Sequence, residues 1–249
     1  MNGAPPPAKR VRWRPLSGCA LLLVAVLVVF KVACGSTRRH ASGPNSLVAF
    51  AFRDHVPGYQ KYASEKFALH YLEQEYDEVQ YLEATASDDG QARLLAAIEQ
   101  AALTHDEIDL FFLSHGNSYV GWLSTLTVNA RTRVRFVYDT GAGDSRQGPA
   151  WLAGGTTAFV GHPSGNVAPL FLRFFLPCWV DGKKLKTCVD DANRDTKDEV
   201  MGGAAKALSV VLDAVGGPHL DRAKLWAGTE AVIYGDDSLV VRRPGPRPP

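Results

Sequence analysis

The chain has 249 residues, and its 27 Lys and Arg residues nearly balance its 26 Asp and Glu residues. The charges are scattered evenly and leave no basic face, so we expect no nucleic-acid partner. No metal-ligand spacing, phosphate-binding glycine loop or dinucleotide fingerprint occurs, so no metal and no cofactor are expected.

The first segment, residues 1–36, carries a membrane or export signal. Arg10, Arg12 and Arg14 precede an apolar run from Leu16 to Phe30. Positive residues followed by such a run are typical of a signal peptide or a short membrane anchor. The domain is therefore expected to be tethered to a membrane and to lie outside the cytoplasm, in the cell envelope.

Two kinds of anchor fit the end of this run. Residues 32–36 resemble a bacterial lipoprotein processing site in which Cys34 becomes lipidated, although Lys31 stands where such sites have an apolar residue. Without cleavage, the run from Leu16 to Cys34 is close to the ~20 residues that a membrane-spanning helix needs. Residues 37–45 form a polar linker in either case.

Residues 46–240 are expected to form one α/β domain, and the Pro-rich residues 241–249 a disordered tail. Strands and helices alternate along most of this stretch. That alternation predicts a mainly parallel sheet with right-handed crossovers and helices on both faces. The predicted strands are 47–52, 79–82, 109–114, 133–139, 156–160 and an edge strand 231–234; the predicted helices are 59–76, 91–103, 167–180, 184–193 and 199–215, with a polar and aromatic crossover at 117–130.

Polar residues follow two neighbouring strands of this sheet. His115 and Gly116 follow the first strand, and Asp139, Gly141 and Ala142 follow the next. The carboxyl ends of parallel strands form one crevice, so these residues are expected to converge. A histidine in such a place suits the activation of a nucleophile, although a loop histidine that caps a backbone carbonyl has the same sequence signature.

This pattern resembles the superfamily of cysteine peptidases that contains caspases, legumain, clostripain and gingipains. His115-Gly116 matches the catalytic histidine motif, residues 151–162 and 171–192 resemble the elements that follow, and the resemblance covers about residues 47–193. It implies a three-layer caspase-like fold. It also places Ala142 where the nucleophilic cysteine belongs.

The resemblance therefore implies a pseudoenzyme that has kept the histidine and lost the nucleophile. Its crevice is expected to bind a peptide or protein ligand, with Gly116, Gly141 and His162 as binding residues beside the degenerate catalytic set His115, Asp139 and Ala142.

The main rival is an active hydrolase in which His115 works with Asp139 or with the hydroxyl of Thr140 or Ser145. Residues 139–142 also spell the Asp-Thr-Gly-Ala motif of retroviral-type aspartic peptidases, but those enzymes use two copies on an all-β scaffold. Residues 161–165 resemble the nucleophile elbow of α/β-hydrolases with altered spacing. The simplest role for Asp139 is to cap its own loop.

Two cysteines fall within the domain. An exported domain can oxidise Cys178 and Cys188 to a disulfide, whereas two buried thiols fit the sequence equally well, because spacing alone does not show that they meet.

Overall fold

The computed structural model describes residues 46–54, 68–85, 87–113, 119–163, 168–202, 223 and 226–241. All of them belong to the larger of the two units into which the chain divides, Thr37–Pro249. The predicted anchor, His115 and Gly116 lie outside the described residues. Within the described ranges, no helix has the length and apolar character needed to cross a membrane.

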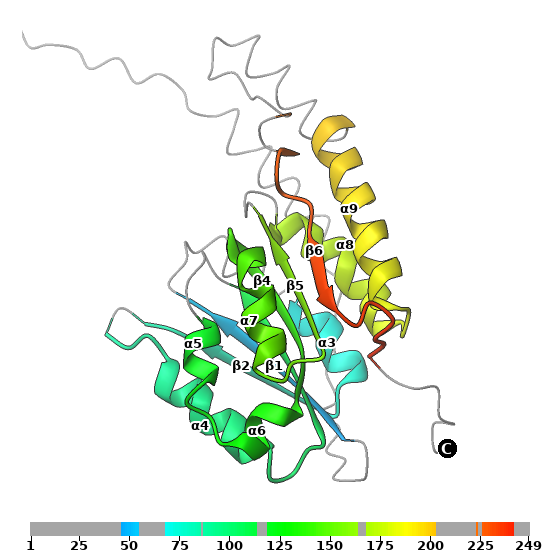
Figure 1. Cartoon of the computed structure of the whole chain (residues 1–249). Coiled ribbons are helices and arrows are strands. Elements are labelled where there is room, and N and C mark those ends of the chain that lie inside the picture. Colours follow the sequence, from blue (N-terminus) through cyan, green and yellow to red (C-terminus); the bar gives the residue numbers. More distant parts are fainter. Residues whose placement is uncertain are drawn as a thin grey trace, which may run out of the picture. The chain divides into compact units, whose positions relative to one another are not determined.

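A six-stranded sheet forms the centre of the domain (Figure 1). The strand order is β2-β1-β3-β4-β5-β6, and every neighbouring pair is parallel except β5 and β6. This confirms the predicted α/β class and the predicted edge strand, and it shows that this edge strand is antiparallel. The strands are β1 (Leu47–Arg53), β2 (Glu78–Glu83), β3 (Glu107–Leu113), β4 (Val134–Ala142), β5 (Ala158–His162) and β6 (Val232–Gly235).

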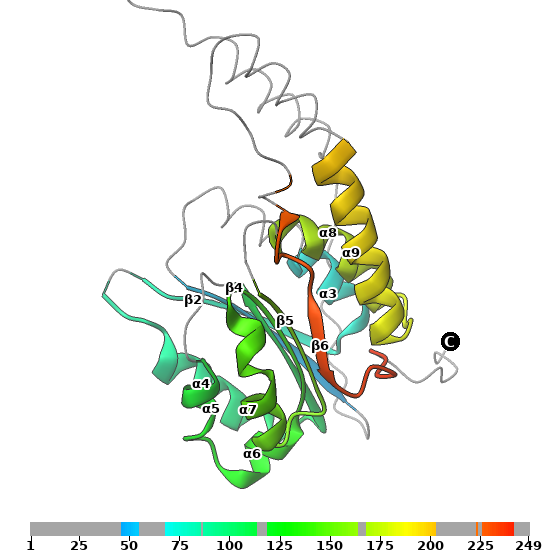
Figure 2. The ribbon, with the colours of Figure 1, turned by 45° about the horizontal axis from the view of Figure 1, so that its top comes forward.

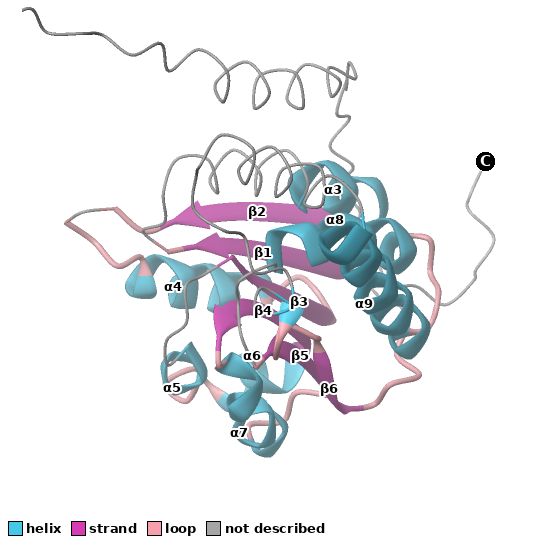
Figure 3. Cartoon of the chain, turned by 90° about the horizontal axis from the view of Figure 1, so that it is seen from above, coloured by secondary structure: helices cyan, strands magenta, loops and turns pink. Residues whose placement is uncertain are grey.

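Helices cover both faces of the sheet and make three layers (Figures 2 and 3). One face carries α3 (His70–Glu75), α8 (Ala168–Val180) and α9 (Leu185–Gly202). The other carries α4 (Gln91–Ala101), α5 (Tyr119–Leu123), α6 (Val128–Arg133) and α7 (Gly148–Ala153), with the short 3-10 helix η2 (Asp144–Gln147) before α7. The predicted three-layer α/β arrangement is therefore confirmed.

The continuous apolar run of β3 explains why two layers of helices are needed. Successive side chains of a strand point to opposite faces. Phe111 and Leu113 accordingly enter the core under α3, α8 and α9, whereas Leu110 and Phe112 enter the core under α4 to α7. A strand that is apolar on both sides is stable only when both faces are covered.

The predicted interruption between residues 193 and 199 is wrong, because α9 is one helix from Leu185 to Gly202. The polar run 193–199 favoured a break. The exposed residues of this run are Arg194, Lys197 and Asp198. The buried face continues through Ala192, Thr196 and Val200 at intervals of four residues. A helix needs only one apolar face, so the polar run did not end it.

The segment that follows β6 packs against the domain. Val241, which was assigned to the tail, is buried. Arg135 of β4 donates hydrogen bonds to the carbonyls of Val240 (2.9 Å) and Val241 (3.2 Å). These bonds hold the segment after β6 against the fold, and residues 242–249 lie outside the described residues.

Candidate functional site

The register of the sheet brings two of the predicted site regions together. Asp139 of β4 pairs with Phe112 of β3 on one side and with Gly161 of β5 on the other. Ala142 then pairs with His162 after a shift in register. The predicted convergence of β4 and β5 residues at the carboxyl edge is confirmed. The histidine half of the pair, His115 with Gly116, lies outside the described residues and stays a prediction.

Asp139 stabilises the irregular carboxyl end of β4, where the register with β5 shifts. Its side chain is fully buried, and its Oδ1 accepts a hydrogen bond of 2.9 Å from the backbone N–H of Gly141. This is the capping role that the sequence suggested as the simplest one. Burial, with the nearby charge of Asp139, also raises the pKa of Tyr138 well above its ordinary value.

The fold excludes one alternative for Asp139. Retroviral-type aspartic peptidases are built on an all-β scaffold, whereas Asp139 lies within β4, a strand of a mainly parallel sheet between helical layers. The Asp-Thr-Gly-Ala match is therefore a coincidence of sequence, because four residues do not specify a fold.

Ala142 differs from Asp139 in being exposed. It is the last residue of β4, and Gly143 follows with a φ of 85°, a left-handed conformation that glycine adopts without strain. The N–H of Gly143 donates to the carbonyl of His162 at 3.1 Å, which fixes this turn against the end of β5. A methyl group thus stands at the position that the resemblance gives to a nucleophile.

The hydroxyl groups that a rival nucleophile would need are less accessible. Thr140 is 8% exposed and Ser145 is 6% exposed. Ser145 lies in η2, whose backbone packs closely on β5: a Cβ added to Gly161 would stand 3.0 Å from the Ser145 nitrogen. This close approach explains the glycine at 161 without any catalytic role.

His162, which was predicted to be a binding residue, is a core residue. The prediction placed it after the fifth strand, but it is the last residue of β5 and is fully buried. Its Nδ1 donates to the carbonyl of Thr229 at 2.7 Å, and its Nε2 then accepts from the hydroxyl of Tyr138 at 3.1 Å. Burial lowers the pKa of His162 to about 4, so the ring is neutral at physiological pH.

The sequence analysis missed two charged residues at the same edge of the sheet. Arg53 ends β1 and donates to Glu83 at the end of β2 at 2.7 Å. The next residue, Asp54, accepts from the hydroxyl of Tyr119 at 3.3 Å. The sequence carried a sign of them, because Arg53 and Asp54 are two charged residues directly after the apolar run 47–52.

Within the ranges that the structure describes, no group of three or more His, Cys, Asp or Glu residues is placed to hold a metal ion. No protein-family model matches the chain, and the search of curated proteins finds no match either. The resemblance to caspase-like peptidases therefore rests on residues of this sequence and remains a hypothesis.

Proposed function

We propose that this chain is a membrane-tethered, caspase-like pseudopeptidase whose carboxyl sheet edge binds a peptide or protein segment without cleaving it. The observation that carries the proposal is the exposed Ala142 at the end of β4. Ala142 is exposed at the position where covalent chemistry requires a nucleophile, and its side chain is only a methyl group. Binding needs the shape of such an edge and not a reactive atom.

The neighbouring side chains support binding over hydrolysis. The carboxylate of Asp139 is buried and accepts a hydrogen bond from the Gly141 amide, and Thr140 and Ser145 are buried too. A nucleophile must reach the substrate carbonyl at about 3 Å, which these positions do not favour. The rival hydrolase therefore has to use groups that are poorly accessible.

The tether and the compartment rest on two further observations. Residues 1–36 carry the charged and apolar pattern of an export signal or anchor. In the domain, Cys178 and Cys188 form a disulfide with a Cα–Cα distance of 5.4 Å. Disulfides persist in oxidising compartments, which supports a domain outside the cytoplasm.

A peptide-binding experiment with a bulky substitution tests the proposed site. The full-length protein in detergent is titrated against a library of fluorescein-labelled octapeptides, and each mixture is checked for cleavage by mass spectrometry. Ala142→Trp places a large ring at the exposed edge. The matched control is Ala153→Trp, at the exposed end of α7.

We expect some peptides to bind the native protein and the Ala153→Trp variant alike, with no cleavage. Ala142→Trp should weaken binding at least tenfold, because its ring fills the space that the peptide occupies. Cleavage by the native protein that disappears in His115→Ala would establish the rival hydrolase. Equal binding by both tryptophan variants would place the peptide elsewhere, and a library without any binder would refute the binding role.

A further inference from the structure

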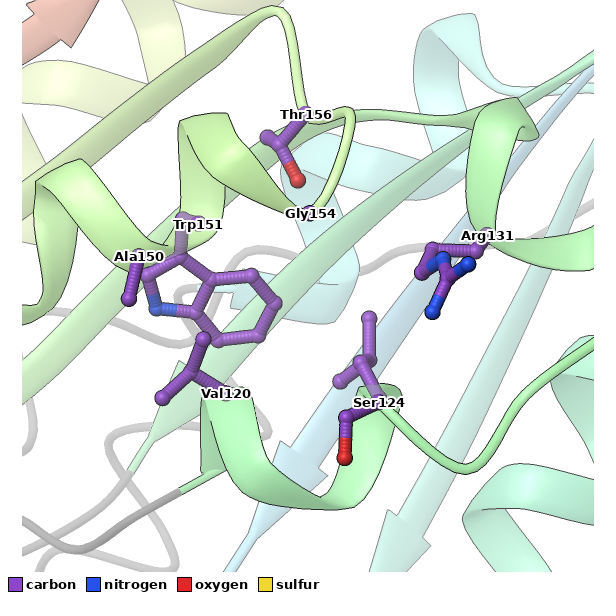
Figure 4. A pocket seen from close by; sticks show the side chains of 8 residues that line it. Val120, Ser124, Arg131, Ala150, Trp151, Gly154 and Thr156 are labelled. Carbon is purple, nitrogen blue, oxygen red and sulfur yellow. The ribbon is translucent and has the colours of Figure 1, made fainter. Parts of the chain in front are cut away.

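A cavity of about 130 Å³ lies among α5, α6 and α7, on the face of the sheet opposite α8 and α9 (Figure 4). Its wall consists of Val120, Leu123, Ser124, Arg131, Ala150, Trp151, Gly154 and Thr156. Arg131 comes just before β4, and Thr156 comes just before β5. The cavity is therefore associated with the amino ends of these strands, whereas Ala142 is at the carboxyl end of β4.

Arg131 supplies a positive charge that the described part of the chain does not neutralise. It is partly buried in the last turn of α6. Its neighbour Arg133 donates to the carbonyl of His105 and pairs with Asp106. The guanidinium of Arg131 has no such partner within the described ranges, and Figure 4 shows it turned toward the cavity. A partly buried guanidinium favours an anionic ligand with paired oxygens.

Two further polar groups of the wall can donate hydrogen bonds. The Thr156 hydroxyl is turned toward the same space in Figure 4. The indole N–H of Trp151 is buried and finds no acceptor in the described structure. In Figure 4 this nitrogen lies on the side of Val120 and Ala150. That side is away from Arg131, so the donors that face the ligand space are the guanidinium of Arg131 and the hydroxyl of Thr156, which suit a ligand with acceptor oxygens.

Most of the wall is apolar, and this decides between kinds of anion. Val120, Leu123, Ala150 and the ring of Trp151 surround the space beside Arg131. A strongly hydrated inorganic anion gains nothing from such a surface. An organic acid places its carboxylate on the guanidinium and its hydrocarbon body on the apolar wall. A cavity of this size holds a body about as large as benzene.

From this geometry we propose that the cavity is a binding site for a small monocarboxylate with a compact apolar or aromatic body. The Arg131 guanidinium pairs with the carboxylate, the Thr156 hydroxyl donates a further hydrogen bond, and the indole of Trp151 packs against the body. The site is separate from the peptide-binding edge proposed above, so either can exist without the other.

Benzoate is the probe for this site. Its binding to the full-length protein in detergent is measured at pH 7.5 by ligand-observed saturation-transfer NMR, with benzamide and phosphate as comparisons. Arg131→Gln removes the charge. Thr156→Val removes the hydroxyl at constant shape. Lys197→Gln, on the exposed side of α9, removes one positive charge far from the cavity and is the matched control.

We expect benzoate to bind the native protein and Lys197→Gln with the same affinity. Arg131→Gln should raise the dissociation constant about tenfold or more, and Thr156→Val should raise it by a smaller factor. Benzamide and phosphate should bind far more weakly, since one lacks the charge and the other the apolar body. Equal binding of benzoate by native protein and Arg131→Gln, tighter binding of phosphate, or no binding of benzoate would overturn the proposal.

Discussion

At the scale of single residues, His162 is the clearest case of a polar group committed to the core. Both ring nitrogens have partners, Tyr138 and the carbonyl of Thr229, and the ring is fully buried. Burial lowers its pKa from 6.5 to about 4. The unfolded chain therefore takes up a proton at a higher pH than the folded protein does, and this difference couples folding to pH.

The coupling predicts a loss of stability in mildly acid solution. A histidine with a lowered folded pKa stabilises the fold fully above about pH 6.5 and progressively less as the pH falls toward about 4. His162→Gln has no such titration. The free energy of unfolding of the native protein minus that of His162→Gln should be larger at pH 7.5 than at pH 4.5, by about 2–3 kcal/mol.

Urea denaturation of both proteins at the two pH values measures this difference. Groups other than His162 titrate in both proteins and cancel in the comparison. A stability advantage that is the same at pH 7.5 and at pH 4.5 would show that His162 is not buried in its neutral form.

At the scale of secondary-structure elements, the pair formed by α8 and α9 is built from one apolar face on each helix and one covalent link. The buried residues of α9 fall on one helix face and lie against α8. Cys178 of α8 is only partly buried, whereas Cys188 of α9 is fully buried, and the two are joined. The sequence left oxidised and reduced cysteines as equal alternatives, and the approach of the two helices favours the oxidised pair.

Replacing both cysteines, in Cys178→Ser/Cys188→Ser, should lower the free energy of unfolding. The two cysteines are 10 positions apart. Closing a loop of that length stabilises a fold by about 2–3 kcal/mol, mainly by restricting the unfolded chain.

Guanidinium denaturation with and without dithiothreitol is the measurement. The reductant should destabilise the native protein and leave the double variant unchanged. If the native protein, unfolded without reductant, reacts with maleimide at Cys178 and Cys188, the disulfide is absent.

At the scale of the whole molecule, one buried polar network joins elements that are far apart in sequence. Arg135 of β4 forms a two-pronged pair with Asp109 of β3, with both N–O distances at 2.9 Å. The hydroxyl of Tyr76 donates to Asp109 at 2.6 Å and accepts from the indole N–H of Trp179 at 2.9 Å. The same guanidinium holds the carbonyls of Val240 and Val241.

Electrostatics within this network favour a charged pair. Burial opposes the charged form of Arg135, but the charge and hydrogen bonds of Asp109 outweigh it, so the pKa of Arg135 is raised. Burial and the charge of Asp109 also raise the pKa of Tyr76 well above its ordinary value. Tyr76 is therefore a neutral donor and Asp109 an acceptor held by three hydrogen bonds.

Removing one member of the pair should cost more than removing both. Arg135→Met leaves the Asp109 carboxylate buried without its cation, which should destabilise the fold by about 3–5 kcal/mol. Arg135→Met/Asp109→Leu removes both charges and should be less destabilised than the single variant. Urea denaturation of the native protein and both variants at pH 7.5 measures their free energies of unfolding. If Arg135→Met is within about 1 kcal/mol of the native protein, the buried pair is contradicted.

The sequence by itself determined the class of the fold and the order of its strands along the chain. The apolar runs of β1 and β3 and the alanine-rich α4 are local patterns, and local periodicity is enough to identify strands and helices. The expectation that Asp139 and His162 lie at one edge also came from the sequence, because parallel strands put their carboxyl ends together.

Only the tertiary structure decided which polar residues are accessible and which partners they have. His162 and Ala142 both end strands, yet one is a core residue and the other is exposed. The pairing of Cys178 with Cys188 and of Asp109 with Arg135 likewise depends on how elements pack. Burial and partners are set by contacts between residues that are distant in sequence, and a local pattern carries no information about those contacts.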